Sequence, residues 1–218
     1  MRWVRERRLV LEAAREIYET KMVIGTWGNV SMRALDDPYM LVTPSGMNYK
    51  SMSIDDIVLV DFDCKVIKGE WLPSSESPLH AAVYKNKPEI CGIVHVHSPY
   101  ATAFGVAQRS IPVVLEETAE VIGHEIPVLP YYQCGTSELA EHVAGALDER
   151  KALLLANHGL VGVGRDLFEA MRVVQIAERT AMIAFFAHNL GGCHILADKD
   201  IAELNSRFRH YGQSKPRL

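Results

Sequence analysis

The chain has 218 residues, 23 Lys and Arg against 27 Asp and Glu, and a formal net charge of −4. A length of this order suits one domain, which we place at residues 1–218. The near-average composition excludes collagen-like, coiled-coil and disordered proteins. Because the charge is mildly acidic and no long basic block occurs, we expect no general nucleic-acid binding, although a local patch could bind a phosphorylated metabolite.

Apolar stretches, the N-terminal residues and the cysteines indicate the cellular compartment. No apolar stretch reaches the ~18 residues that span a bilayer, so we expect no membrane association. The first eight residues are charged and lack the apolar core of a signal peptide. The four cysteines are widely spaced, which argues against a disulfide framework in a chain of this length. We therefore expect a reduced, cytoplasmic protein.

Hydrophobic periodicity predicts helices and short strands in the first half of the chain. Apolar residues at helical spacing predict a helix over 4–22, which the segment 25–29 breaks. Short strands are expected at 30–32 and 39–43, with a turn at 36–38. Strands at 57–62 and 65–67 suggest a hairpin. A proline near the first turn then predicts a helix over 77–85.

The second half continues the mixture. An apolar, β-branched strand is expected at 91–96, followed by a helix from about residue 100. Further strands are predicted at 126–129 and 152–156, and helices over 136–147, 166–189 and 198–211. This mixture favours an α/β or α+β domain with a largely antiparallel central sheet and helices on its faces.

Two histidines lie at the end of the predicted strand 91–96. Successive side chains of a strand point to opposite faces, so His95 and His97 point the same way, roughly 6.5 Å apart. Two such imidazoles could hold one cation at about 2.1 Å, although two solvent-facing histidines would show the same pattern. His158 repeats the arrangement after the apolar run 152–155. Three neutral imidazoles suit a divalent transition metal with open positions for substrate.

Ser74, Ser75 and Glu76 precede a predicted helix. Free N–H groups and the helix dipole favour an anion there, and Glu76 beside it would be a metal ligand or a proton shuttle. N-capping by Ser75 or Ser77 explains the same residues and, on this segment alone, is the simpler interpretation. His80, one turn into the helix, is expected to be structural.

Two other loops could cradle an anion. The segment 26–31 offers small residues and side-chain donors, and the segment 43–46 offers a hydroxyl and Gly46, whose backbone can approach a ligand closely. Neither matches the phosphate-loop pattern that ends in Gly-Lys-Ser/Thr. An ordinary turn explains each segment taken by itself.

Five motifs follow one another along the chain: Gly28-Asn29-Val30-Ser31, Thr43-Pro44-Ser45-Gly46, Ser74-Ser75-Glu76, His95-Val96-His97 and Asn157-His158-Gly159. In this order they resemble the class II aldolase/adducin-head family, and within it the sugar-phosphate aldolases that act on L-fuculose 1-phosphate. The resemblance covers about residues 5–212. No single motif is specific, but the combination is.

The resemblance implies an α/β fold around a mostly antiparallel sheet, assembled as a C4 homotetramer with active sites at the subunit interfaces. It implies a divalent metal, with Zn²⁺ as first choice and Mn²⁺ or Co²⁺ also suited to the same ligands. The metal ligands carried over by motif are Glu76, His95, His97 and His158. Glu76 is also implied as the catalytic acid/base. The implied phosphate-binding residues are Thr26, Asn29, Thr43, Gly46, Ser74 and Ser75.

The resemblance is less complete on the aldehyde side. Tyr211 resembles a C-terminal tyrosine that closes over the site. Where the fuculose-phosphate enzyme has a tyrosine that reaches the neighbouring subunit's site, this chain has Glu116, which we expect to be catalytic. A phenylalanine that lines the aldehyde pocket corresponds to Cys134. The epimerase of the family places an aspartate in the same interface segment, and Glu120 falls near that position.

The resemblance implies a metal-dependent aldolase that cleaves a ketose 1-phosphate to dihydroxyacetone phosphate and an aldehyde. Candidate substrates are L-fuculose 1-phosphate, 5-deoxyribulose 1-phosphate and 5-methylthioribulose 1-phosphate. One alternative is a sugar-phosphate 4-epimerase or dehydratase in which Glu116, Glu117 or Glu120 donates the extra proton. Another is a non-enzymatic interaction module like the adducin head, which has no need for the intact metal set.

Overall fold

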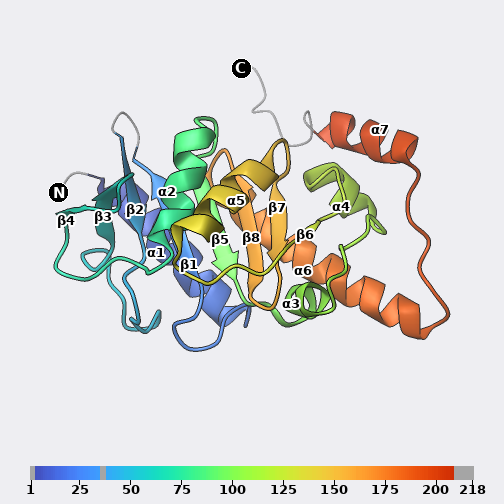
Figure 1. The fold of residues 1–218 in the computed structure, drawn as a ribbon, viewed down its shortest axis with the longest axis horizontal. Coiled ribbons are helices and arrows are strands. Elements are labelled where there is room, and N and C mark those ends of the chain that lie inside the picture. Colours follow the sequence, from blue (N-terminus) through green and yellow to red (C-terminus); the bar gives the residue numbers. More distant parts are fainter. Residues whose placement is uncertain (1–2, 35–37, 209–218) are drawn as a thin grey trace, which may run out of the picture.

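The computed structural model describes residues 3–34 and 38–208. These residues form one eight-stranded sheet with the order β4-β3-β2-β1-β5-β8-β7-β6 (Figure 1). Every pairing is antiparallel except that of β6 with β7. The expected α/β architecture with a mostly antiparallel sheet flanked by helices is thus confirmed.

The strands are β1 (Asn29–Arg33), β2 (Tyr39–Val42), β3 (Val58–Asp61), β4 (Val66–Lys68), β5 (Gly92–Val96), β6 (Val128–Leu129), β7 (Ala152–Leu155) and β8 (Gly159–Gly164). The helices are α1 (Val4–Glu19), α2 (Ser77–Asn86), α3 (Pro99–Val106), α4 (Glu116–Val121), α5 (Ser137–Leu147), α6 (Leu167–Asn189) and α7 (Asp198–Phe208). Most expected elements are present with ends shifted by one to three residues. The last residues of the expected final helix, and most of the expected turn at 36–38, lie outside the described residues.

Two elements were not predicted. The chain after His158 was expected to turn, but it forms the buried strand β8 between β5 and β7. Glycine lets this strand lie close under α6, because a Cβ atom on Gly162 would come within 2.5 Å of Val174 Cγ1. The other element is α4, a single short helix of 6 residues that begins at Glu116.

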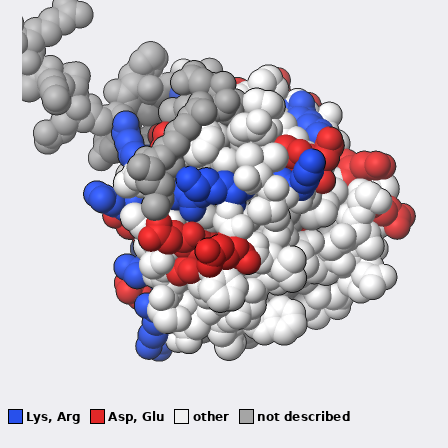
Figure 2. Space-filling view, turned by 90° about the vertical axis from the view of Figure 1, so that its left-hand side faces the viewer, with Lys and Arg blue, Asp and Glu red and all other residues white. Residues whose placement is uncertain are grey.

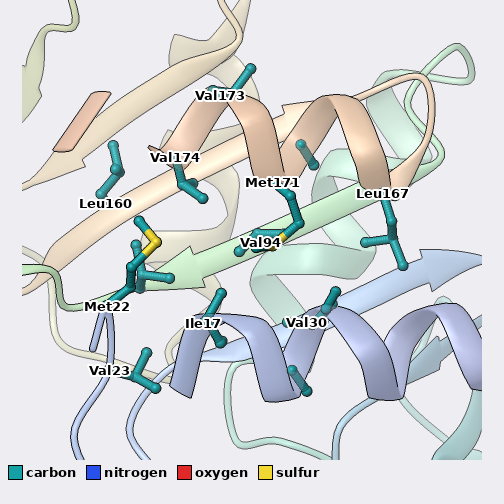
Figure 3. Packing of buried hydrophobic residues seen from close by; sticks show 14 of the residues in the cluster. Ile17, Met22, Val23, Val30, Val94, Leu160, Leu167, Met171, Val173 and Val174 are labelled. Carbon is teal, nitrogen blue, oxygen red and sulfur yellow. The ribbon is translucent and has the colours of Figure 1, made fainter. Parts of the chain in front are cut away.

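Helices cover both faces of the sheet. The helices α1, α3 and α6 pack on one face, and α2 and α5 lie on the other. Figure 3 shows the first of these layers, where Ile17 of α1 and Met171 of α6 meet Val30 and Val94 of the sheet. Complete burial of an aliphatic side chain of this size contributes about 1.5–3 kcal/mol, so the two layers hold the central strands firmly.

Successive side chains of the central strand β5 point alternately into the two layers. Val94 and Val96 belong to the core under α1 and α6, whereas Ile93 packs with the side chains of α2 and α5. His95 is therefore on the α2 side, at the end of the strand marked by its arrowhead (Figure 1). This places the first histidine of the motif next to the start of α2.

None of the described helices is long and apolar enough to span a membrane. Figure 2 shows the face at the β4 end of the sheet, where small groups of Lys and Arg alternate with groups of Asp and Glu. The ion pair between Lys85 and Asp63, 2.7 Å apart, is one example of this mixed charge among exposed residues.

Candidate metal centre and active site

Three histidines come together where β5 ends and β8 begins. His95 is on β5, His97 follows its last residue, and His158 lies in the turn between β7 and β8. Because β5 and β8 are antiparallel neighbours with Val96 opposite Leu160, this turn is held beside the end of β5. The prediction that His95 and His97 share a face is confirmed, and Val96 between them belongs to the apolar core.

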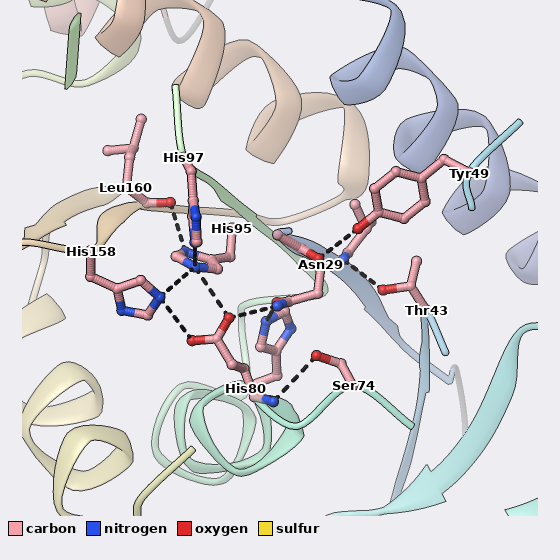
Figure 4. Close-up of polar contacts among 12 residues, drawn as sticks. Asn29, Thr43, Tyr49, Ser74, His80, His95, His97, His158 and Leu160 are labelled. Atoms are coloured by element: carbon pink, nitrogen blue, oxygen red, sulfur yellow. Dashed lines mark hydrogen bonds and ion pairs between the residues drawn. The ribbon is translucent and has the colours of Figure 1, made fainter. Parts of the chain in front are cut away.

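The imidazole nitrogens lie at distances that suit shared ligation. His95 Nε2 is 3.0 Å from His97 Nε2 and 3.3 Å from His158 Nε2. Donors placed tetrahedrally about 2.1 Å from a zinc ion are about 3.4 Å from one another. The three rings meet edge to face, with centroids 4.8 to 5.0 Å apart, so each can direct one nitrogen to a common point (Figure 4).

Glu76 provides the fourth donor of this cluster. Its Oε2 lies 3.2 Å from His95 Nε2 and its Oε1 lies 3.4 Å from His158 Nε2. The side chain is buried, and within the described chain Oε1 makes no conventional hydrogen bond. One ligand atom from each of the four residues lies within 4.8 Å of the others. A buried carboxylate oxygen without a donor, facing three imidazoles, fits a divalent metal.

The start of α2 explains how Glu76 reaches the histidines. Glu76 is the residue immediately before the helix, where its negative charge is favoured by the helix dipole. Its carboxylate does not cap the helix, and the Ser74 hydroxyl instead accepts the Glu76 backbone N–H at 3.2 Å. The simpler interpretation of this segment as a helix cap by Ser75 or Ser77 is therefore not what the structure shows.

The electrostatics of the cluster favour binding of a cation. Burial would raise the pKa of Glu76, but the charge and hydrogen bond of His95 and the charge of His158 outweigh it and hold the pKa below its usual value. Burial, followed by the charge of His95, lowers the pKa of His97 to about 3 and that of His158 to about 4. Burial would lower the pKa of His95, but the charge and hydrogen bond of Glu76 outweigh it and raise that pKa, so the metal-free cluster favours a proton on His95 that a bound metal would replace. The ionised carboxylate and the neutral imidazoles of His97 and His158 are already in the protonation states that metal ligands require.

A contact behind the cluster fixes the orientation of His95. Its Nδ1 lies 3.0 Å from the carbonyl oxygen of Leu160, to which it donates (Figure 4). With a proton held on Nδ1, Nε2 is the nitrogen that faces the other ligands and is available to a metal. Such a contact to the second ring nitrogen is typical of metal-binding histidines.

The residues expected to bind phosphate lie on loops that meet beside the cluster. Thr43 links two of them, since its hydroxyl accepts the Val30 N–H at 3.2 Å and its carbonyl accepts the Ser74 N–H at 3.0 Å. The remaining expected residues differ in exposure. Thr26, Gly46 and Ser75 are exposed, whereas Asn29 is buried with its amide nitrogen 2.8 Å from Glu76 Oε2.

The residues expected on the aldehyde side of the site do not all lie beside the histidine cluster. The Cys134 thiol lies beside the Glu76 carboxylate, and burial, followed by the charge of Glu76, raises its pKa to about 12. Glu116 is exposed at the first residue of α4, a helix that packs on α6 and α7, and Glu117 pairs with Arg179 at 3.5 Å. Tyr211 lies outside the described residues.

One residue was expected to be structural but reaches the site. His80 is completely buried, and its Nε2 lies 2.6 Å from Asn29 Oδ1, on the far side of the Asn29 amide from Glu76. The spacing of four residues between Glu76 and His80 could have indicated this, because it places both on one side of a helix.

A separate cavity of about 900 Å³ lies at the other end of β8, lined by residues that include Gly164, Lys151 and Glu169. It contains none of the four cluster residues. Two of its basic residues pair with the same carboxylate, since Glu169 is 2.9 Å from Lys151 Nζ and 3.0 Å from Arg165 Nε. Among the described residues, the group that could hold a metal ion is the histidine cluster with Glu76.

Comparison with known proteins agrees with this geometry. The model of the class II aldolase and adducin N-terminal domain matches residues 8–185. The chain belongs to this family. As a class II aldolase family member, it is 36% identical over 206 residues to the L-fuculose phosphate aldolase of Escherichia coli K12, covering 94% of each chain.

Another relative of this class II aldolase family member is named for a different substrate. The chain is 30% identical over 209 residues to the 5-deoxy-D-ribulose 1-phosphate aldolase of Bacillus thuringiensis, covering 96% of this chain and 98% of the relative. The solved structure of an L-fuculose 1-phosphate aldolase has a TM-score of 0.89 and 32% identity, covering 94% of this chain and 96% of that one. The resemblance inferred from the five motifs is confirmed.

Proposed function

We propose that this protein is a metal-dependent aldolase that cleaves a ketose 1-phosphate to dihydroxyacetone phosphate and an aldehyde. The observation that carries the proposal is the convergence of Glu76, His95, His97 and His158 beside the loops of the expected phosphate site. Relatives named for L-fuculose phosphate and 5-deoxyribulose 1-phosphate support this substrate class. Both compounds and 5-methylthioribulose 1-phosphate are the candidate substrates.

The three histidines and Glu76 would hold the metal, for which we propose Zn²⁺ first and Mn²⁺ or Co²⁺ as alternatives. When bound, a divalent cation supplies Lewis-acid stabilisation of the negative charge that develops on the ketose carbonyl oxygen as the C–C bond breaks.

The protein residues have two further tasks. Cleavage between C3 and C4 removes the proton of the C4 hydroxyl and adds a proton to C3. Glu76, whose Oε1 lacks a hydrogen bond within the described chain, is the group that we propose moves the proton at C3. The loops that contain Thr26, Thr43 and Ser74 would hold the phosphate, so that the reacting carbons stay at a fixed distance from Glu76.

We also propose that the active enzyme is a homotetramer with sites at subunit interfaces. Trp27 supports this, because it is 67% exposed although its ring lies 6.2 Å from that of His97. A large exposed aromatic side chain beside a polar site is typical of a surface that another subunit covers. Glu116 from the neighbouring subunit would then be the additional acid of the site.

The carboxylates of α4 are compatible with a second reaction class: Glu116 is exposed, and Glu117 and Glu120 are half-buried. If Glu116, Glu117 or Glu120 donates a proton from the neighbouring subunit, the same scaffold would serve a 4-epimerase or a dehydratase. Product analysis separates the three reactions, because the epimerase yields a stereoisomer, the dehydratase a product of water loss and the aldolase a triose phosphate.

The decisive test is release of dihydroxyacetone phosphate from the three candidate ketose 1-phosphates, with the enzyme stripped of metal and then reloaded with Zn²⁺, Mn²⁺ or Co²⁺. We expect release from at least one substrate, dependent on metal and lost in Glu76→Gln. Absence of release from all three substrates, or full activity in Glu76→Gln, would overturn the proposal. Metal analysis of the purified protein tests the adducin-like alternative, which a persistent lack of bound metal would favour.

A further inference from the structure

A stripe of polar side chains on α2 faces a stripe of polar side chains on β1. Residues 76, 80 and 84 follow one another at intervals of four, which places them on one side of α2. Residues 29 and 31 alternate on β1 and lie opposite His95 and Ile93 of β5, so they face the α2 side of the sheet. The two stripes meet inside the protein rather than at its surface.

The contacts form an unbroken chain that ends on the metal-binding carboxylate. Tyr84 Oη lies 2.9 Å from Ser31 Oγ, which lies 2.6 Å from His80 Nδ1. His80 Nε2 lies 2.6 Å from Asn29 Oδ1, and Asn29 Nδ2 lies 2.8 Å from Glu76 Oε2. All five side chains are buried, and Figure 4 shows Asn29 between His80 and the carboxylate.

The chemistry of the groups permits one order of protons along this chain. An ionised carboxylate only accepts, so Asn29 must present its NH₂ group to Glu76 and its carbonyl oxygen to His80. That oxygen also only accepts, so His80 must carry its proton on Nε2. As a neutral imidazole, His80 then accepts at Nδ1 from the Ser31 hydroxyl, which in turn accepts from Tyr84.

We propose that His80 is a positioning residue that fixes the Asn29 amide and, through it, the orientation of the Glu76 carboxylate in the metal centre. This inference rests on the proposed function, because it assigns a role to Glu76 as ligand and proton carrier. Asn29 touches Glu76 directly, whereas His80 acts through Asn29. Ser31 and Tyr84 complete the arrangement by holding the His80 ring in its Nε2–H form.

Packing alone does not require an imidazole at position 80. The residue is completely buried, and a side chain without polar atoms would fill the space without needing partners. If the Nε2–H donor is lost, no hydrogen bond keeps the Asn29 carbonyl oxygen directed at position 80. Rotation of the amide would then direct that oxygen at the Glu76 carboxylate. A misdirected carboxylate weakens the metal centre, because the residues behind metal ligands set ligand geometry.

The test compares two substitutions of His80 with one control. His80→Met removes both hydrogen bonds, whereas in His80→Gln the side-chain amide can still donate to Asn29 from near the Nε2 position. Thr118→Val is the control, since it breaks a buried hydroxyl pair, Thr118 Oγ1 to Thr180 Oγ1 at 2.6 Å, between α4 and α6. Zn²⁺ affinity is measured by competition with a chromogenic chelator, with the thermal midpoint of each variant as a check on folding.

We expect His80→Met to weaken Zn²⁺ binding about 10- to 100-fold, the range for residues that orient metal ligands. His80→Gln should recover most of that loss, and Thr118→Val should bind Zn²⁺ like the wild type. A folded His80→Met variant with wild-type affinity, or a Gln variant as weak as Met, would overturn the proposal. Nitrogen NMR of the wild-type imidazole gives a second test, because a proton on Nδ1 instead of Nε2 would also overturn it.

The outcomes separate this inference from the proposed aldolase. Wild-type Zn²⁺ binding that is insensitive to His80→Met overturns the positioning role and leaves the aldolase intact. Weakened binding in His80→Met, together with no release of dihydroxyacetone phosphate by the wild type, supports the positioning role and overturns the aldolase. A wild-type protein that binds no divalent metal overturns both.

Discussion

Substitution of Gly159 by alanine should damage the proposed metal centre without replacing any of its ligands. Gly159 begins β8, next to the end of β5. A Cβ atom built there would lie 2.4 Å from the Val96 carbonyl oxygen, 2.9 Å from His97 Cδ2 and 3.2 Å from His95 Cε1. The first of these contacts is with backbone, so rotation of a side chain cannot relieve it.

The size of the effect follows from these distances. Real Cβ atoms essentially never approach closer than 3.0 Å, so the strands must separate by about 0.6 Å, the difference between 3.0 and 2.4 Å. Metal sites tolerate ligand displacements of about 0.2 Å, so a shift of this size should weaken Zn²⁺ binding about 10- to 100-fold. Overpacking between central strands should also lower the free energy of unfolding by about 1–3 kcal/mol.

Zn²⁺ affinity by chelator competition and the free energy of unfolding in urea measure the two effects. Gly145→Ala is the matched control, because Gly145 lies within α5 and a Cβ atom there would meet nothing within 4 Å. That change should leave Zn²⁺ affinity unchanged and stabilise the protein by up to about 1 kcal/mol. Wild-type Zn²⁺ affinity in Gly159→Ala would refute the argument that close strand packing positions the histidines.

Three further predictions concern Glu76, His80 and Cys134. Glu76→Gln should lower the rate of dihydroxyacetone phosphate release at least about 100-fold, the lower end for loss of a general acid–base, and a wild-type rate would exclude that role. In metal-free protein, burial lowers the pKa of His80 from 6.5 to about 3. Between pH 7 and 5, His80 therefore becomes protonated in the unfolded chain but stays neutral in the folded protein. Stability that is present above pH 6.5 is therefore lost as the pH falls, by about 2 kcal/mol at pH 5 from this residue. Urea unfolding of His80→Gln should show a loss of stability between pH 7 and 5 that is smaller than that of the wild type by about this amount. An equal pH dependence in the two proteins would contradict the role assigned to His80. Because burial and then the charge of Glu76 raise the pKa of Cys134 to about 12, iodoacetamide should label its thiol slowly at pH 8. Peptide mapping should show faster labelling in metal-free Glu76→Gln, and an unchanged rate would mean that the carboxylate does not act on the thiol.

The fold could be predicted from the sequence wherever apolar periodicity was uninterrupted. The helix α6 and the strand β5 were predicted close to their observed bounds, and Asp166 caps α6 by accepting from the Glu169 N–H at 2.7 Å. β8 was not predicted, because its glycines carry no strand signal. They are required by the close approach of α6 and β5, which is a tertiary constraint. The short helix α4 likewise lacks enough turns to show a helical period.

Part of the candidate site could likewise be predicted from the sequence, and part could not. The clustering of the three histidines could be predicted because each lies at or just beyond the end of an apolar strand, and the ends of neighbouring strands lie close together. The buried contacts of His80 and Asn29 could not, because they depend on how α2 packs over β1. Asn29, expected to bind phosphate, has its amide between Glu76 and His80 in the structure. Only the register of β1 against β5 shows that these residues face α2.

The central claim is that one divalent cation binds among three histidines and Glu76. Anomalous diffraction at the zinc edge, on crystals of the protein loaded with one equivalent of Zn²⁺, tests it most directly. We predict a single strong peak about 2.1 Å from the Nε2 atoms of His95, His97 and His158, with a Glu76 carboxylate oxygen completing the coordination. A peak elsewhere in the protein, or one from which His158 is absent as a ligand, would contradict the claim.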